Sequence, residues 1–297
     1  MKKNDFIEII DFLVKGTPLK NNFIESVIMR EEGMTNRNYL AKTITGEKYI
    51  VRIPGLGTSE IIDRKSEWDN HRKIANLFIN VNPVLYLKNS WIKVSGYIDN
   101  KFDLVSTRKK QIDLVCKTLK VLHGSNIKFE NRFWVGDVIE MYEAVVKRNK
   151  IKLDHRYYSY RNSLKNYYET QLYENMHWTA CHNDLVKENI IYDGKKKLYL
   201  IDWEYSGMND PLWDITSYSL ENQLNNEEQK YFLQQYYGPN STREINTIVA
   251  LFKVYQDILW YLWAKIKEFH GVDYSKYSTM RLNRAAKNYR NIQKNIF

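Results

Sequence analysis

Three polar side chains, Asp184, Asn189 and Asp202, lie within residues 179–214 at spacings that suit phosphoryl transfer. Apolar runs flank them, and an Asp-Gly pair at 193–194 is typical of a tight hairpin turn, so the three are expected at the ends of neighbouring short strands. Phosphoryl transfer needs one carboxylate to accept the proton of the attacking hydroxyl, and an amide and a second carboxylate to hold Mg²⁺ on the nucleotide phosphates. Asp184 is the predicted base, and Asn189 and Asp202 are the predicted metal ligands. The alternative is a set of surface polar residues around a hairpin.

The same stretch resembles the choline/ethanolamine kinases, a group of kinase-like small-molecule phosphotransferases. The resemblance rests on His182-Asn183-Asp184-Leu185, Asn189, Ile201-Asp202-Trp203-Glu204-Tyr205, Asn209 and Asp214. Protein kinases carry Asp-Phe-Gly where this chain has Asp-Trp-Glu, which points away from protein substrates. Two residues are expected to support the loop rather than react. His182 should brace it, and Asp214, at a helix start, should accept its backbone hydrogen bonds.

The part of the site that binds the nucleotide is expected nearer the N-terminus, in the turn Gly33-Met34-Thr35-Asn36. Small and amide-bearing residues between two strands let backbone N–H groups approach phosphates, although an ordinary hairpin could have the same composition. The turn resembles the phosphate loop of the choline kinase family, which implies that Gly33, Thr35 and Asn36 bind nucleotide. By the same resemblance, Arg52 takes the place of the kinase phosphate-binding lysine. Arg52 needs an anionic partner, and Glu67 on the equivalent of the kinase C-helix is the candidate; a plain surface glutamate is the alternative.

Aromatic residues recur at helical spacing near the C-terminus. Trp260 and Trp263 share a helix face, and Tyr274 and Tyr277 repeat the spacing. Ring faces attract a quaternary ammonium group by cation–π interaction, whereas a hydrophobic core would use the same residue types. The pattern Trp-x-x-Trp followed by Tyr-x-x-Tyr-x3-Arg is similar to the choline-binding end of choline kinases. The implied substrate-binding residues are Asp184, Glu221, Trp260, Trp263, Tyr277 and Arg281.

Composition narrows the functional class. The net charge of +10 and the pI near 9.2 would favour a polyanion or steer a phosphate-bearing substrate. The lysines are spread and lack an aromatic stacking platform, so no nucleic-acid partner is expected. The most hydrophobic window, residues 247–266, contains four charged or amide side chains, so no membrane insertion is expected and the enzyme should be cytoplasmic. Cys116 and Cys181 are too few for a disulfide framework and are expected to be reduced and buried.

The pattern of elements predicts an α+β, two-lobed fold like that of the protein kinases. Five strands should form an N-terminal antiparallel sheet with a C-helix, followed by a mainly helical C-terminal lobe. The predicted divisions are a nucleotide-binding lobe at 1–98, a connector at 99–106 and a catalytic and substrate-binding lobe at 107–297. The expected elements are a helix at 6–14, strands at 23–29, 37–43, 48–53, 83–86 and 91–97, a helix from Thr58 or Ser59 to about 78, two helices within 133–176, and one or two helices over 242–269.

These interpretations favour ATP-dependent phosphorylation of choline to phosphocholine, with ATP and Mg²⁺ as cofactors. On the same fold the acceptor could instead be ethanolamine or an aminoglycoside. An aminoglycoside site requires many carboxylates near the cleft, whereas the C-terminal part of this chain is mainly aromatic. A basic nucleic-acid-binding protein would leave the three site residues unexplained, and so would a nucleotide-binding scaffold without activity. The sequence favours no oligomeric state.

Overall fold

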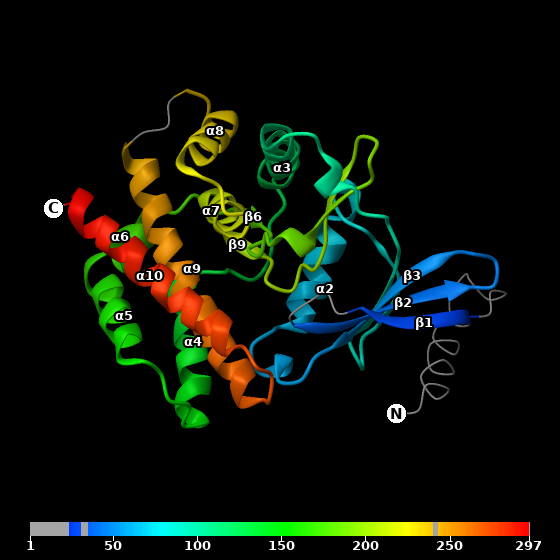
Figure 1. The fold of residues 1–297 in the computed structure, drawn as a ribbon, viewed down its shortest axis with the longest axis horizontal. Helices are drawn as coiled ribbons and strands as arrows, with labels where there is room; N and C mark the ends of the chain where they lie inside the picture. Colours follow the sequence, from blue (N-terminus) through cyan, green and yellow to red (C-terminus); the bar gives the residue numbers. More distant parts are fainter. Residues whose placement is uncertain (1–23, 31–34, 240–242, 297) are drawn as a thin grey trace.

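A five-stranded sheet and a larger helical body lie side by side in the computed structural model of the chain (Figure 1). The structure describes residues 24–30, 35–239 and 243–296. The helix expected at 6–14 and the residues Phe23 and Gly33 lie outside the described residues. The expected architecture, an antiparallel sheet followed by a mainly helical part, is confirmed.

The sheet has the order β1-β2-β3-β5-β4, and every neighbouring pair is antiparallel. Its strands are β1 (Ile24–Arg30), β2 (Asn36–Thr43), β3 (Lys48–Pro54), β4 (Pro83–Leu87) and β5 (Ile92–Gly96). Successive side chains point to opposite faces of a strand. Val51 and Val94 pair across β3 and β5 in a small apolar core, and the next pair, Arg52 and Lys93, therefore points to the opposite face.

The helix after β3 begins later than the sequence predicts. Thr58–Glu60 forms a single 3₁₀ turn, and α2 spans Arg64–Lys73. The N-cap of α2 is Asp63, because its carboxylate accepts hydrogen bonds from the backbone N–H groups of Lys65 and Ser66. The prediction that Thr58 or Ser59 caps this helix is therefore wrong. The helix also ends earlier, with a second 3₁₀ turn at Ala75–Leu77 before Phe78 adopts a positive φ of 57°.

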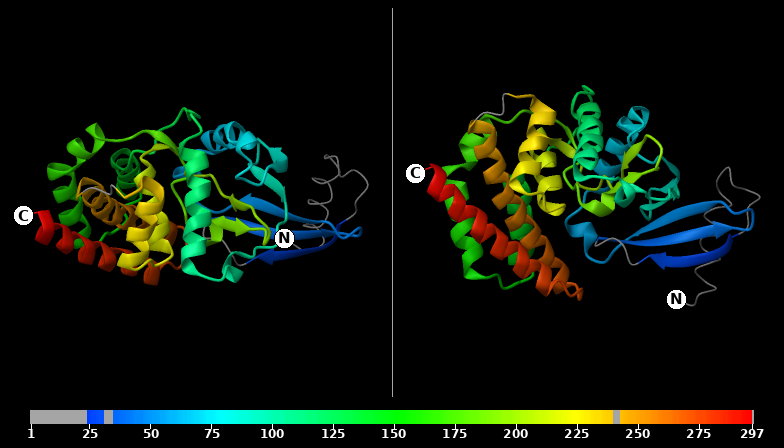
Figure 2. Two further views of the ribbon diagram at one scale, coloured as in Figure 1. Left: turned by 90° about the horizontal axis from the view of Figure 1, so that it is seen from above. Right: turned by 45° about the horizontal axis from the view of Figure 1, so that its top comes forward.

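The helical body is built around two long helices that run side by side in every view, α9 (Arg243–Phe269) and α10 (Ser275–Ile296) (Figure 2). The other helices are α3 (Arg108–His123), α4 (Val135–Arg148), α5 (His155–Tyr167), α6 (Glu169–Glu174), α7 (Pro211–Glu221) and α8 (Asn226–Tyr237). Residues 133–176 thus hold three helices, where two were predicted. Tyr168, at φ −128° and ψ −26°, leaves helical geometry and separates α5 from α6.

Two small antiparallel pairs lie between the sheet and the helices. β6 (Thr179–Cys181) pairs with β9 (Gly207–Asn209), and β7 (Ile190–Tyr192) pairs with β8 (Leu198–Leu200). The turn between β7 and β8 uses Asp193, whose carboxylate accepts three backbone N–H groups, and Gly194 at a φ of 77°. The segment between β6 and β7 carries Asp184 and Asn189, and the segment after β8 carries Asp202.

The principal core fills the helical body and includes the fully buried Trp203, Trp213 and Phe252. Cys116 and Cys181 are both buried and form no disulfide, as expected. Within the described residues, no helix combines the length and the hydropathy required to cross a bilayer.

Candidate active site

The loop after β6 is fixed by the first turn of α7. The carboxylate of Asp214 accepts the backbone N–H of His182 at 2.9 Å and that of Asn183 at 2.7 Å. Trp213 donates its indole N–H to the carbonyl of Asn183 at 3.2 Å, and Asn183 has a positive φ of 70°. Asp214 is therefore a loop anchor and does not face a substrate.

His182 braces the same loop from within. Its Nε2 lies 2.9 Å from the carbonyl oxygen of Ile201, and its Nδ1 accepts the backbone N–H of Asp184 at 3.3 Å. Burial lowers the pKa of His182, although the charge of Asp214 opposes the shift. A neutral imidazole in this position ties the Asp184 loop to the strand that leads to Asp202.

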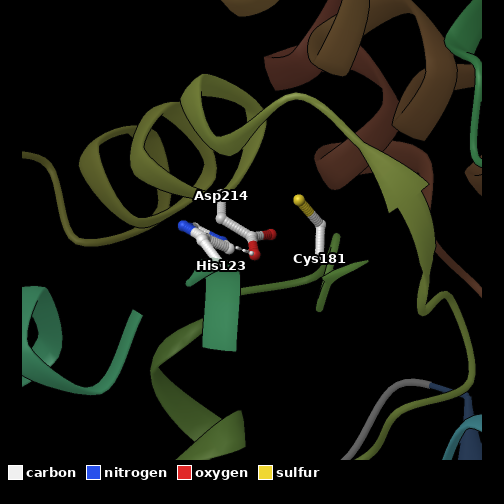
Figure 3. A group of neighbouring side chains, drawn as sticks. All are labelled: His123, Cys181 and Asp214. Carbon is white, nitrogen blue, oxygen red and sulfur yellow. Dashed lines mark hydrogen bonds and ion pairs between the residues drawn. The ribbon is translucent and has the colours of Figure 1, made fainter. Parts of the chain in front are cut away.

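A buried group behind the loop, His123, Cys181 and Asp214, brings three potential metal-ligand atoms within 4.8 Å (Figure 3). His123 Nε2 lies 3.0 Å from Asp214 Oδ2, and His123 Nδ1 lies 2.7 Å from the Tyr236 hydroxyl. Both Asp214 oxygens already accept N–H donors, and burial raises the pKa of the Cys181 thiol well above its ordinary value, which keeps the sulfur protonated. These properties fit a hydrogen-bonded support for the loop rather than a metal site.

Asp184 and Asn189 are brought into direct contact. A 3₁₀ turn at Lys187–Asn189 brings the side-chain amide of Asn189 next to Asp184. Asn189 Nδ2 donates to the backbone carbonyl of Asp184 at 2.9 Å and to its Oδ2 at 3.1 Å. Burial raises the pKa of Asp184 well above its ordinary value, and the charges of Glu204, Asp202 and Glu221 add to the shift. The carboxyl group therefore binds a proton more tightly than an exposed aspartate does.

Asp202 follows the β7–β8 hairpin, and its charge acts on the pKa of Asp184. It has a positive φ of 62°, which is an unusual conformation for a residue other than glycine and turns its side chain toward the sheet. Arg52 Nη1 donates to Asp202 Oδ1 at 2.5 Å, and Asn36 Nδ2 donates to Oδ2 at 3.3 Å. Asp202 thus links the segment after β8 to strands β2 and β3.

A buried network of charges connects the sheet with this segment. Glu67 contacts Arg52 at 2.5 Å, Arg64 at 2.8 Å and Lys93 at 3.6 Å. Although burial opposes ionisation, the charges of these three cations lower the pKa of Glu67 to about 2. The ion pair expected between Arg52 and Glu67 is present.

Glu204 is the second carboxylate of this network. It accepts from Asn36 at 2.8 Å and from Arg64 at 2.9 Å. Burial, together with the nearby charge of Asp202, raises the pKa of Glu204 to about 7. From the sequence, Glu204 was named only as part of a motif, and Arg64 and Lys93 were missed. The i,i+3 spacing of Arg64 and Glu67 could have indicated that Arg64 pairs with Glu67, whereas no sequence pattern indicates Lys93.

A pocket of about 540 Å³ opens between the sheet and the loops. Its walls include Arg52, Lys93, Asn189 and Asp202, and also residues 96–100, which lead from β5 toward α3. Lys101 of this connecting segment donates its backbone N–H to Tyr192 at 2.7 Å, so β7 supports it. The carbonyl of Thr35 lies against Gly55, and neither Thr35 nor Asn36 lines the pocket; Asn36 is turned toward Asp202 and Glu204 instead.

The C-terminal aromatic residues form two separate contacts. Trp263 packs against Tyr274, with ring centroids 5.1 Å apart, and against Tyr277 at 6.1 Å. Trp260 packs edge-on against Tyr205 at 5.0 Å. Both tryptophans are largely buried, with 6% and 3% of their surface exposed for Trp260 and Trp263. The two rings therefore lie on the side of α9 that faces the Asp202–Tyr205 segment and the start of α10.

Both terminal nitrogens of Arg281 are engaged by protein groups. Its two terminal nitrogens donate to the two oxygens of Glu221 at 2.6 and 2.8 Å, and Nη2 also contacts the Tyr277 hydroxyl at 2.5 Å. Its guanidinium carbon lies 4.7 Å from the centre of the Tyr277 ring. A guanidinium so placed neutralises Glu221 and covers one side of Tyr277.

Comparisons with known proteins identify the family to which the chain belongs. A family model described as choline/ethanolamine kinase matches residues 27–286. The protein LicA of Haemophilus influenzae is 31% identical over 264 residues, which cover 86% of this chain and 98% of that protein. A structure described as choline kinase LicA from Streptococcus pneumoniae superposes with a TM-score of 0.84 at 31% identity, covering 97% of this chain and 99% of that one. A structure of LicA in complex with AMP gives a TM-score of 0.81, with coverage of 96% and 98%.

Proposed function

Because the chain belongs to the choline/ethanolamine kinase family and is a phosphotransferase that acts on an alcohol, we propose that it transfers the γ-phosphoryl group of ATP to choline. The observation that carries the proposal is that Asn189 and Asp202 line one pocket, that Asn189 holds the carboxylate of Asp184, and that aromatic residues cluster on α9 and α10. The AMP complex of a protein that is 31% identical supports a nucleotide in this pocket.

Asp184 acts as the base. Its carboxylate accepts the proton of the choline hydroxyl as the oxygen attacks phosphorus, and the contact with Asn189 holds the carboxylate in one orientation. Burial raises the pKa of Asp184, so the ionised carboxylate is a stronger base than that of an exposed aspartate. His182 and Asp214 keep the loop in place without taking part in proton transfer.

Asn189 and Asp202 fit a magnesium site. Asn189 donates through Nδ2 to Asp184, so its amide oxygen is the atom left for a cation, and Asp202 offers a carboxylate that already attracts the guanidinium of Arg52. Oxygen ligands of these two kinds are the ones Mg²⁺ prefers. When bound, Mg²⁺ offsets the charge of the transferring phosphoryl group. Arg52, held by Glu67 at the pocket wall, would orient the nucleotide phosphates.

The aromatic cluster selects a trimethylammonium group. Trp263, Tyr274 and Tyr277 present ring faces and edges, and Trp260 supports the side next to Tyr205. A quaternary ammonium has no N–H to donate and gains from ring faces, whereas a primary ammonium needs hydrogen-bond acceptors. Glu221 lies at this end in a bidentate pair with Arg281. Arg281, being a cation, serves the site by holding Glu221 and Tyr277.

A coupled assay of ADP release with MgATP and choline, ethanolamine or kanamycin tests this function. We expect kcat/KM to be highest for choline, lower for ethanolamine and negligible for kanamycin. Preference for ethanolamine would keep the catalytic assignment and remove the substrate assignment. Activity on kanamycin alone would contradict both the aromatic site and the choice of acceptor.

A further inference from the structure

A charge cluster of Glu221, Asp257, Arg281 and Arg284 joins three helices beside the aromatic residues. Glu221 is the last residue of α7, Asp257 lies in the middle of α9, and the two arginines lie one turn apart on α10. Asp257 is fully buried, Arg281 is 1% exposed, and the other two side chains are half-buried. Removing these groups from water is costly unless each is closely paired.

The pairing within the charge cluster is nearly complete. Asp257 accepts from Arg281 Nη1 at 3.2 Å and from Arg284 Nε and Nη2 at 2.9 and 2.7 Å. Glu221 accepts both terminal nitrogens of Arg281 and is 3.3 Å from Arg284 Nη2. Each guanidinium thus bridges both carboxylates. Two negative and two positive groups balance, so the charge cluster as a whole is neutral.

The charge cluster lies close to the reacting end of the site. Ser217, one helical turn before Glu221 on the same face of α7, accepts the backbone N–H of Leu185 at 3.1 Å, and Leu185 directly follows Asp184. Tyr277, one turn before Arg281 on α10, contacts Trp263. The charge of Glu221 raises the pKa of Asp184, and the charge of Arg281 lowers it. A substrate bound between Asp184 and the aromatic residues would lie within reach of both charges.

Arg281 poses an electrostatic problem for a cationic substrate. A permanent guanidinium charge on the wall of an ammonium site repels the substrate unless nearby carboxylates cancel it. Arg281 divides its hydrogen bonds between Glu221 and Asp257, so its charge is not offset by Glu221 alone. Asp257 supplies the second carboxylate, and Arg284 limits the resulting excess of negative charge.

We propose that Asp257 and Arg284 are positioning residues that set the electrostatic potential at the substrate ammonium site through Arg281. This proposal rests on the proposed function, because it presumes a cationic substrate between Asp184 and the aromatic cluster. Neither residue touches the substrate. Asp257 lowers the positive potential of Arg281, and Arg284 keeps Asp257 paired and the charge cluster neutral. The affinity for a cation then depends on the net charge of the charge cluster, whereas the affinity for a neutral ligand of the same shape does not.

A comparison of choline with its neutral isostere, 3,3-dimethylbutan-1-ol, separates charge from shape. Binding of both ligands would be measured by calorimetry in the presence of MgADP, for the wild type, Asp257→Asn, Arg284→Gln and the double variant. Asp257→Asn leaves the charge cluster with one excess positive charge, Arg284→Gln leaves one excess negative charge, and the double variant is again neutral. Asn keeps the size of Asp but has one acceptor oxygen in place of two, and Gln is shorter than Arg and keeps two of its five N–H donors, so both variants are also compared by the neutral isostere.

We expect Asp257→Asn to weaken choline binding roughly tenfold, the effect of one unit charge within roughly 10 Å at an effective dielectric constant of about 20. Binding of the neutral isostere should change less than about twofold. Arg284→Gln should leave choline affinity unchanged or higher, and the double variant should return it to near the wild-type value. Loss and recovery of choline binding without a matching change for the neutral isostere is an outcome that a purely structural role does not produce.

Other outcomes have separate meanings. Equal weakening for choline and the isostere in Asp257→Asn, or no recovery in the double variant, would overturn the proposal while leaving the proposed function intact. If the wild type binds ethanolamine instead of choline, the same comparison with ethanolamine and propan-1-ol decides the proposal. If it binds no ammonium alcohol, the proposed function fails, and this inference fails with it. Thermal unfolding of each variant, read beside the binding data, identifies a variant that has lost its fold.

Discussion

At the scale of single residues, Asp184 has surroundings that raise its affinity for a proton. It is half-buried, and burial and three nearby carboxylates raise its pKa. The substitution Asp184→Asn keeps the shape of the side chain and removes proton acceptance. We expect kcat to fall by a factor on the order of 10² or more with little change in the KM for choline, as measured in steady state. Near-normal turnover would exclude Asp184 as the base.

The same pKa shift predicts an effect on stability with a definite sign. A carboxyl group whose pKa is raised by folding stabilises the folded state at low pH, and this contribution is lost as pH rises from its unfolded value, about 4, through its folded value. Wild-type protein therefore holds an ionised, poorly solvated Asp184 at high pH. Asp184→Asn should raise the Tm at pH 8, and the difference from wild type should vanish near pH 4. A Tm that falls at pH 8 would show that hydrogen-bond donors stabilise the carboxylate by more than burial destabilises it.

Residue types and spacing were sufficient to predict which side chains meet near Asp184, but not how they are paired. Asp184, Asn189 and Asp202 lie in one stretch of sequence, so local pattern reveals them. Arg64, Glu204 and Lys93 join the same network from three separate segments, and their pairing depends on how the sheet packs against the segment after β8. Arg281 matched a family pattern, yet its partners Asp257 and Arg284 became evident only when α9 and α10 were seen side by side.

At the scale of elements, α9 presents its two tryptophans to different neighbours. Trp263 contacts the two tyrosines, so Trp263→Leu should raise the KM for choline by the equivalent of about 0.5 to 2 kcal/mol, the worth of one cation–π contact. It should also narrow the preference for choline over ethanolamine. Phe252→Leu is a matched control on the same helix, because Phe252 packs against Trp213 in the core. Phe252→Leu should lower stability and leave the preference for choline over ethanolamine unchanged. If Trp263→Leu also lowers stability and leaves that preference unchanged, Trp263 belongs to the core alone.

Gly55, directly after β3, packs against the backbone of Thr35, the residue before β2. A Cβ on Gly55 would lie 2.1 Å from the carbonyl oxygen of Thr35, so the backbone must move to accommodate it. Gly55→Ala should therefore raise the KM for ATP more than that for choline. Gly46→Ala is the control: Gly46 has a φ of 92° and open space around its Cβ, so that substitution strains a distant turn without displacing Thr35. Equal effects of the two variants on the KM for ATP would show that the Thr35 turn does not shape the nucleotide site.

Periodicity predicted most elements but set the boundaries of α2 wrongly. The apolar residues Ile61 and Ile62 fitted a helix beginning at Thr58, and both are buried as a helix would bury them. The stronger cap, Asp63, instead starts the helix just before Arg64, which places Arg64 and Glu67 one turn apart in the charged network. Competition between neighbouring capping residues is settled by backbone hydrogen bonds that a sequence pattern does not rank.

At the scale of the whole molecule, Asp202 connects the sheet to the helical body through Arg52 and Asn36. A ligand that binds the folded state raises Tm. For the wild type we expect MgATP to raise Tm more than ATP with a chelator does, whereas Asp202→Ala should abolish the difference. Asp69→Ala is the control, since Asp69 forms an exposed ion pair with Lys65 on α2. A magnesium-dependent shift that persists in Asp202→Ala would contradict the metal assignment.

The two-part architecture followed from the order of elements, because a run of strands and then a run of helices admits few arrangements. The strand order was not predictable in the same way. β5 pairs with β3 and leaves β4 at the edge, which brings Lys93 opposite Arg52. This nonlocal pairing places two cations on the pocket wall, and neither the hydrophobic pattern nor the turn residues encode it.

The proposed reaction joins the γ-phosphorus of ATP to the hydroxyl oxygen of choline. Phosphorus NMR of a mixture of the wild type, choline and MgATP tests this reaction directly, because the phosphate ester, ADP and free phosphate give separate signals. We expect phosphocholine and ADP in equal amounts, with no reaction when magnesium is chelated. ADP with free phosphate and no phosphocholine, or no consumption of ATP at all, would contradict the proposed reaction.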